Sequence, residues 1–190
     1  ARIRYYAWKK TREPVVGEEA KELEIAPDQL DVEDAAEKAW EQIDYYLSEM
    51  PPSKFEELVA ALLRAMGYHI AWKAEGGKDG GLDVLAYSDP LGAAGPRIKV
   101  QVKRTAAKVA VDGLRSFLAL LGPNDTGVYV SLGGFTSDAS SESRSQDSRR
   151  VILVDGRELV RLWTEYNARV AESDRALLPL RPIWFLETDE

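Results

Sequence analysis

The residues best suited to chemistry in this sequence of 190 residues are Asp83, Gln101 and Lys103. Asp83 follows the glycine-rich run 76–81 and lies in an otherwise apolar segment, where a carboxylate is costly unless a cation pairs with it. Gln101 and Lys103 are two residues apart, so they share one face of a strand. If these strands pair, the three side chains converge. Carboxylate and amide oxygens suit a hard cation such as Mg²⁺, and an ammonium can position water or offset charge on a phosphoryl group.

Two simpler interpretations compete with this one. Asp83 and Lys103 could form an ordinary ion pair between neighbouring strands. Glu56, a second carboxylate beside an apolar helix stripe, could reach the same metal site. It could instead only cap its own helix, because Ser53–Glu56 has the pattern of a capping box.

The composition excludes several other chemistries. The chain has no cysteine and one histidine, His69, so thiolate nucleophiles, disulfides and Cys-based zinc sites are absent. A His-based metal cluster or a Ser-His-Asp triad would depend on His69 alone. No apolar run approaches the roughly 20 residues that cross a bilayer. We therefore expect a cytoplasmic protein with no membrane partner.

Charge is distributed unevenly along the chain. The net charge is −7, but residues 1–50 hold 7 basic and 13 acidic side chains, and the remainder is nearly balanced. Within 97–115 the only acid is Asp112. Basic residues here could hold phosphates, although a solvated face is the alternative for each. The predicted DNA contacts are Lys99, Arg104 and Lys108, with Gly80 and Gly81 allowing close approach of the DNA backbone.

The elements that must position these residues follow from periodicity. Apolar residues at spacings of three and four predict helices from Asp31 to Met50 and from Ser53 to Gly67. Alternating segments predict strands at 68–72, 82–87 and 97–104.

The remaining pattern alternates between the two types of element. Helices are expected at 112–121, at 136–150 and after 156, and strands at 127–131 and 151–154, the last one buried. Residues 183–185 are a candidate for a short edge strand. The resulting fold class is α/β, with a mixed central sheet flanked by helices on both faces.

An ordered set of segments resembles the catalytic domain of the Mrr-like restriction endonucleases, a branch of the PD-(D/E)xK nuclease superfamily. The resemblance covers about residues 53–166. The segments are 55–59 with 67–68, 80–84, 100–104, 127–131, 133–136 and 154–160.

The resemblance implies a restriction-endonuclease-like fold with an αβββαβ core and hydrolysis of DNA phosphodiesters with Mg²⁺, or alternatively Mn²⁺. Asp83 matches the motif aspartate, Lys103 the catalytic lysine and Glu56 the helix glutamate near the metal. Gln101 stands where most of the superfamily has an acid, as is usual in the Mrr branch.

The predicted organisation is an N-terminal arm and helix at 1–50, a catalytic domain at 51–175 and a tail at 176–190. Double-stranded DNA is the expected substrate. A homodimer is expected for cutting both strands, and the resemblance implies a separate recognition domain or subunit, often one that reads modified bases. Two alternatives stay open: a non-catalytic DNA-binding or assembly module with a nuclease fold, and a structure-specific, junction-resolving nuclease.

Overall fold

The computed structural model describes residues 32–74, 81–93, 95–147 and 149–183. Five strands form one mixed sheet in the spatial order β1-β2-β3-β4-β5. Their bounds are β1 His69–Lys73, β2 Val84–Tyr87, β3 Arg97–Lys103, β4 Asp125–Ser131 and β5 Arg150–Asp155. The mixed α/β fold predicted from the sequence is therefore confirmed.

Helices precede and follow the strands along the chain. Two short elements, η1 Asn167–Arg169 and α7 Glu172–Arg175, follow the last long helix. The longer helices are α2 Val32–Glu49, α3 Pro52–Ala65, α4 Val111–Leu118, α5 Ser137–Arg144 and α6 Gly156–Tyr166. None of the helices in the described part of the chain is long and apolar enough to cross a membrane.

The connections between strands explain their directions. Short turns join β1 to β2 and β2 to β3, and both pairs are antiparallel. Crossovers through α4 and α5 make β3, β4 and β5 parallel. Gln101 lies opposite Tyr129 and Lys103 lies opposite Ser131 in the β3–β4 pair.

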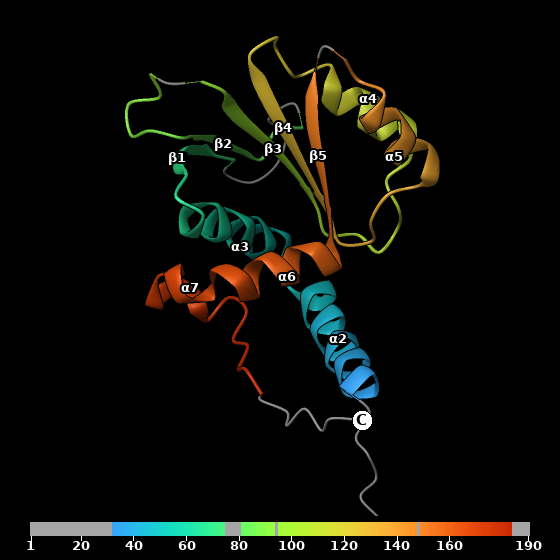
Figure 1. The fold of residues 1–190 in the computed structure, drawn as a ribbon, viewed down its shortest axis with the longest axis vertical. Coiled ribbons are helices and arrows are strands. Elements are labelled where there is room, and N and C mark those ends of the chain that lie inside the picture. Colours follow the sequence, from blue (N-terminus) through green and yellow to red (C-terminus); the bar gives the residue numbers. More distant parts are fainter. Residues whose placement is uncertain (1–31, 75–80, 94, 148, 184–190) are drawn as a thin grey trace, which may run out of the picture.

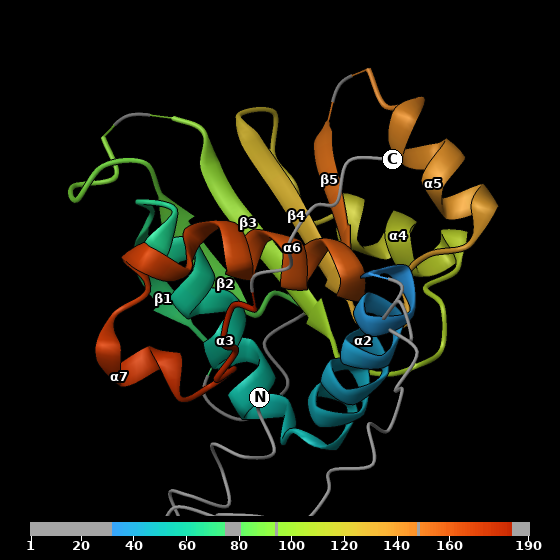
Figure 2. The same cartoon turned by 60° about the horizontal axis from the view of Figure 1, so that its bottom comes forward.

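Helices cover both faces of the sheet (Figure 1). On one face, α3 and α6 pack against Val84, Val100 and Val130, and the last turn of α2 adds the fully buried Leu47. On the other face, α4 and α5 enclose a smaller cluster that includes Phe117 and Tyr129. Figure 2 shows α6 running across the sheet, with α3 beside it and α2 near the start of α6.

Alternation along β3 separates its two kinds of side chain. Val100 and Val102 join the core below α3, so Lys99, Gln101 and Lys103 lie on the face of α4 and α5. The strand pattern read from the sequence is thus the pattern of the fold.

Several boundaries differ from the prediction. β5 is an edge strand whose Ile152 is 43% exposed, whereas we expected a buried strand, because apolar composition alone does not show whether a neighbour follows. α5 ends at Arg144 instead of reaching 150. Residues 176–183 form no strand. The rest of the predicted edge strand and the predicted first residue of the first helix, Asp31, fall outside the described residues.

Candidate active site

Asp83 lies directly before β2, where it continues the pairing with β3. Its amide donates to the Val100 carbonyl and its carbonyl accepts from Ala74, both at 2.9 Å. Its carboxylate accepts a 2.6 Å hydrogen bond from the Val102 amide. The carboxylate therefore sits against the β3 backbone between Gln101 and Lys103.

Gln101 of β3 lies beside the Asp83 carboxylate. Because Val84 lies opposite Val100, Asp83 lies opposite Gln101 and on the same face. Gly81 approaches closely: a Cβ added there would lie 3.2 Å from the Gln101 Nε2, and its φ of +87° is a conformation that glycine adopts readily. The Oε1 of Gln101 is buried and has no hydrogen-bond partner among the described residues.

Lys103 ends β3 on the same face, and its side chain is exposed. Among the described residues no ion pair involves its ammonium. The structure therefore does not show the ordinary Asp83–Lys103 ion pair that was the alternative interpretation.

Glu56 approaches the same region from α3. Burial and the nearby Asp83 carboxylate raise the pKa of Glu56, while Lys73 of β1 acts in the opposite direction. The capping interpretation is wrong, because α3 begins at Pro52, its N-cap is Pro51 and no side chain caps it. Glu56 is therefore available to a site that contains Asp83.

The adjacent Glu57 has a structural role. It binds Lys73 and, at 2.7 Å, Arg64, which also pairs with Asp174 at 3.0 Å. Hydrogen bonds from Lys73 and Arg64 lower the pKa of the Glu57 carboxyl. This network fixes α3 to β1 and thereby orients the helix face that carries Glu56.

Tyr129 belongs to this region but was missed as a site residue. It is fully buried, lies opposite Gln101 and has a hydroxyl without a hydrogen-bond partner in the described structure. Burial and the charge of Asp83 raise the pKa of Tyr129 to about 12. The alternation of Gly127, Tyr129 and Ser131 could have indicated this face, but not its register against β3.

The predicted DNA contacts separate into distinct groups. The ammonium of Lys99 donates to the Leu120 carbonyl at 2.6 Å and pairs at 2.9 Å with the buried Asp125, so it is engaged inside the fold and does not face a phosphate. Arg104 is half-buried, with an enclosed Nε, whereas Lys108 is exposed. Gly80 lies outside the described residues.

The donor set around Asp83 suits a hard divalent cation. No group of three or more His, Asp or Glu side chains able to hold a metal occurs in the described segments. The oxygen donors are two carboxylates, those of Asp83 and Glu56, and the orphaned Oε1 of Gln101. Amide and carboxylate oxygens are the ligands of Mg²⁺ and Mn²⁺, so the residues present fit such an ion.

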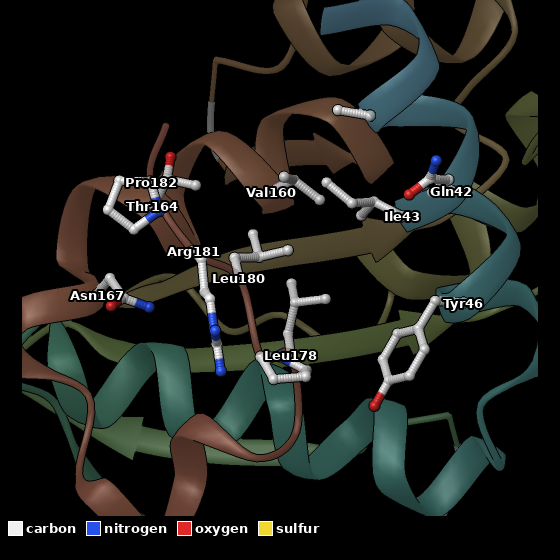
Figure 3. Close-up of a pocket in the computed structure, with 12 residues that line it drawn as sticks. Gln42, Ile43, Tyr46, Val160, Thr164, Asn167, Leu178, Leu180, Arg181 and Pro182 are labelled. Atoms are coloured by element: carbon white, nitrogen blue, oxygen red, sulfur yellow. The ribbon is translucent and has the colours of Figure 1, made fainter. Parts of the chain in front are cut away.

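An apolar groove lies elsewhere. It has a volume of about 510 Å³ and runs between α2, α6 and the segment 178–182 (Figure 3). Ile43 and Tyr46 line it from α2, and Leu178 and Leu180 from the opposite side. None of the candidate catalytic residues lines this groove, so the polar cluster at Asp83 is the better site candidate.

The comparison with known families identifies the family of the chain. The family model described as a restriction endonuclease, the Mrr catalytic domain, matches residues 47–163. The chain belongs to the Mrr restriction endonuclease family. The matched Mrr segment contains Glu56, Asp83, Gln101 and Lys103, and restriction nuclease is the activity class of the family.

A solved structure shows the same fold as this Mrr domain. The DNA modification-dependent restriction endonuclease AspBHI matches with 19% identity and a TM-score of 0.56, over 94% of this chain and 48% of its own. MspJI restriction endonuclease in complex with a 27-mer oligonucleotide matches with 21% identity and a TM-score of 0.46, over 77% of this chain and 34% of its own. The chain thus spans about a third to a half of these proteins. No curated protein matches it.

Proposed function

We propose that this chain is a divalent-metal-dependent endonuclease that hydrolyses phosphodiester bonds of double-stranded DNA in the cytoplasm. The observation that carries the proposal is the Asp83 carboxylate held against β3, opposite an orphaned Gln101 amide oxygen, within an Mrr catalytic domain. Glu56 supports it, because burial and the Asp83 carboxylate raise its pKa, and a cation would relieve the repulsion between the two carboxylates.

Asp83, Gln101 and Glu56 would hold the ion, with Mg²⁺ the proposed cofactor and Mn²⁺ a substitute. A divalent ion bound there would polarise a phosphoryl oxygen and lower the pKa of a bound water.

The chain's own residues supply the rest of the chemistry. Lys103 Nζ is a hydrogen-bond donor that can orient the attacking water and offset the charge on the phosphoryl oxygens. The Val102 amide fixes the Asp83 carboxylate, and Gly81 leaves room for the Gln101 amide. As the water oxygen binds phosphorus and loses a proton to solvent, the bond to the 3′ oxygen breaks. The leaving 3′ oxygen takes up a proton from solvent, so the products are a 5′-phosphate and a 3′-hydroxyl.

Plasmid nicking tests the proposal directly. Wild type should cleave supercoiled plasmid with Mg²⁺ or Mn²⁺ and not with chelator, while Asp83→Ala and Lys103→Ala should lose at least about 100-fold in rate. Asp34→Asn and Lys38→Ala remove exposed charges on α2 and are the matched controls. Equal inactivity of wild type and both site variants, with DNA binding retained, would favour a non-catalytic DNA-binding module.

The choice of DNA distinguishes finer versions of the function. AspBHI is a modification-dependent enzyme, which supports assays on plasmids with and without modified cytosines. Faster cleavage of modified plasmid would extend the proposal to modified DNA. Preference for branched over linear duplexes would instead favour a junction-resolving nuclease.

Cutting both strands requires two copies of the site, so we also propose a homodimer. A separate recognition domain or subunit is proposed as well, because the chain spans only part of its structural neighbours. Light scattering with and without DNA measures the dimer. Direct conversion of supercoiled to linear plasmid, without a nicked intermediate, would support paired cutting.

A further inference from the structure

Three buried polar atoms gather on one face of β3 and β4. They are the Oε1 of Gln101, the hydroxyl of Tyr129 and the hydroxyl of Ser131, and none has a hydrogen-bond partner among the residues that the structure describes. A buried polar group without a partner destabilises the folded protein. Such groups usually bind an ordered water, an ion or a ligand.

The sheet places two of these atoms in one row with Asp83. Asp83 lies opposite Gln101 across β2 and β3, and Gln101 lies opposite Tyr129 across β3 and β4. Side chains directly opposite one another in neighbouring strands share a face, and neighbouring strands lie about 5 Å apart. Gln101 is therefore the middle member, with a carboxylate on one side and a phenol on the other.

The ring of Tyr129 is firmly held in this position. Phe117 and Phe135 contact it edge-on, with ring centroids at 5.1 and 5.6 Å. A Cβ added at Gly113, in the first turn of α4, would lie 3.9 Å from the hydroxyl oxygen. Since burial keeps Tyr129 protonated at neutral pH, its hydroxyl is a donor.

We propose that Tyr129 is a positioning residue whose hydroxyl hydrogen-bonds, through one buried water, to the Oε1 of Gln101. The two oxygens have complementary roles, because the amide oxygen can only accept and the phenol can donate. A bridging water would accept from the phenol and donate to the amide oxygen, and the two side chains lie directly opposite each other on one face of the sheet. The link fixes the amide relative to Asp83, and the second lone pair of Oε1 stays available to a cation.

The catalytic part of this role rests on the proposed nuclease function, but the link itself does not. A double-mutant cycle in metal-free protein therefore tests the link separately from cleavage. The unfolding equilibrium is measured in urea for wild type, Tyr129→Phe, Gln101→Met and the double variant. Phenylalanine keeps the ring and its aromatic contacts, and methionine keeps the approximate shape of glutamine.

The link predicts a loss that depends on Gln101. Tyr129→Phe should lower the ratio of folded to unfolded protein about fivefold when Gln101 is present, because it leaves the amide oxygen without its hydrogen-bonded link. In the Gln101→Met background the same substitution should cause no such loss. An unchanged or raised ratio for Tyr129→Phe alone, or an equal loss in both backgrounds, would overturn the proposal. Tyr46→Phe removes a hydroxyl that donates to the Leu177 carbonyl at 3.2 Å, and its effect should be the same in both backgrounds.

Cleavage kinetics provide a readout that packing alone would not change. Tyr129→Phe should lower kcat about tenfold without changing KM for plasmid, and only when Gln101 is present. If wild type cleaves no DNA while the stability coupling is found, the proposed function fails and the Tyr129–Gln101 link stands. If the coupling is absent in an active nuclease, the link alone fails.

Discussion

At the scale of single residues, the ionised carboxylate of Glu56 lowers the stability of the folded protein but serves the proposed function as a metal ligand. Its pKa lies above its ordinary value because of burial and the Asp83 carboxylate. As the pH rises from the ordinary value of 4.5 through the raised value, ionisation of Glu56 therefore costs the folded state stability. Above that window the charge continues to destabilise the protein unless a cation offsets it.

Glu56→Gln should consequently separate the two properties. We expect the variant to be more stable than wild type at pH 7 without metal, with the difference vanishing below pH 4.5, where both side chains are neutral. Cleavage should fall about 10–100-fold because one ligand charge is lost. Urea melts at both pH values and plasmid nicking measure these effects. A variant less stable than wild type at pH 7 would show that Glu56 makes a stabilising contact instead.

Gly81 and Gly67 offer a matched pair of glycine substitutions. Both have positive φ, +87° and +97°, so alanine should cost about 1 kcal/mol of unfolding free energy at each. Only at Gly81 does the new Cβ meet a site residue, at 3.2 Å from the Gln101 Nε2. Gly81→Ala should therefore also reduce cleavage, whereas Gly67→Ala should not. Equal activity of the two variants would mean that the Gln101 amide can move without consequence.

At the scale of elements, ion pairs fix the strands that carry the site. Asp125, at the start of β4, has a fully buried side chain that binds Arg97 at 2.7 Å, Lys99 at 2.9 Å and the Gly122 amide at 2.8 Å. Burial works to raise the pKa of Asp125, but these partners outweigh it and the net shift is downward. These ion pairs join the first residue of β4 to β3, and so they help to set the register that places Tyr129 opposite Gln101.

Asp125→Asn should be among the most destabilising single substitutions in the sheet. It leaves Lys99 without its buried counter-charge, which costs about 3 kcal/mol at pH 7. The wild-type advantage is fully present above the ordinary pKa of 3.8 and disappears as the pH falls through the lowered folded value. Urea melts at pH 7 and pH 3 check this. Asp112→Asn, whose side chain is 92% exposed, is the control and should change stability by less than about 0.5 kcal/mol.

At the scale of the whole molecule, the proposed function requires an acidic protein to present a basic edge to DNA. The net charge of −7 repels a phosphate backbone, and the basic residues at the end of β3 and in the following loop have to overcome it locally. Lys103 and Lys108 are exposed there, whereas Lys99 is engaged inside the fold. DNA should therefore approach at this end of the sheet.

Salt dependence measures this electrostatic contact. In an Asp83→Ala background, Lys108→Ala should weaken binding of duplexes of any sequence to a similar extent. It should also reduce the slope of log affinity against log salt by about 1. Lys38→Ala on α2 is the matched control and should leave the slope unchanged. An unchanged slope for Lys108→Ala would remove this residue from the DNA interface.

The sequence by itself determined what depends on neighbouring residues. Alternation along 97–103 and the Gln101–Lys103 spacing predicted a shared face, and apolar periodicity predicted the order of helices and strands, because both periods are local properties of the backbone. Only the tertiary structure decided which strands meet and in what register. In the structure Tyr129 lies opposite Gln101, and Lys99 pairs with Asp125. Glu56 does not cap its helix, and β5 lies at an edge of the sheet. These outcomes depend on contacts between residues far apart in the chain, which no local pattern records.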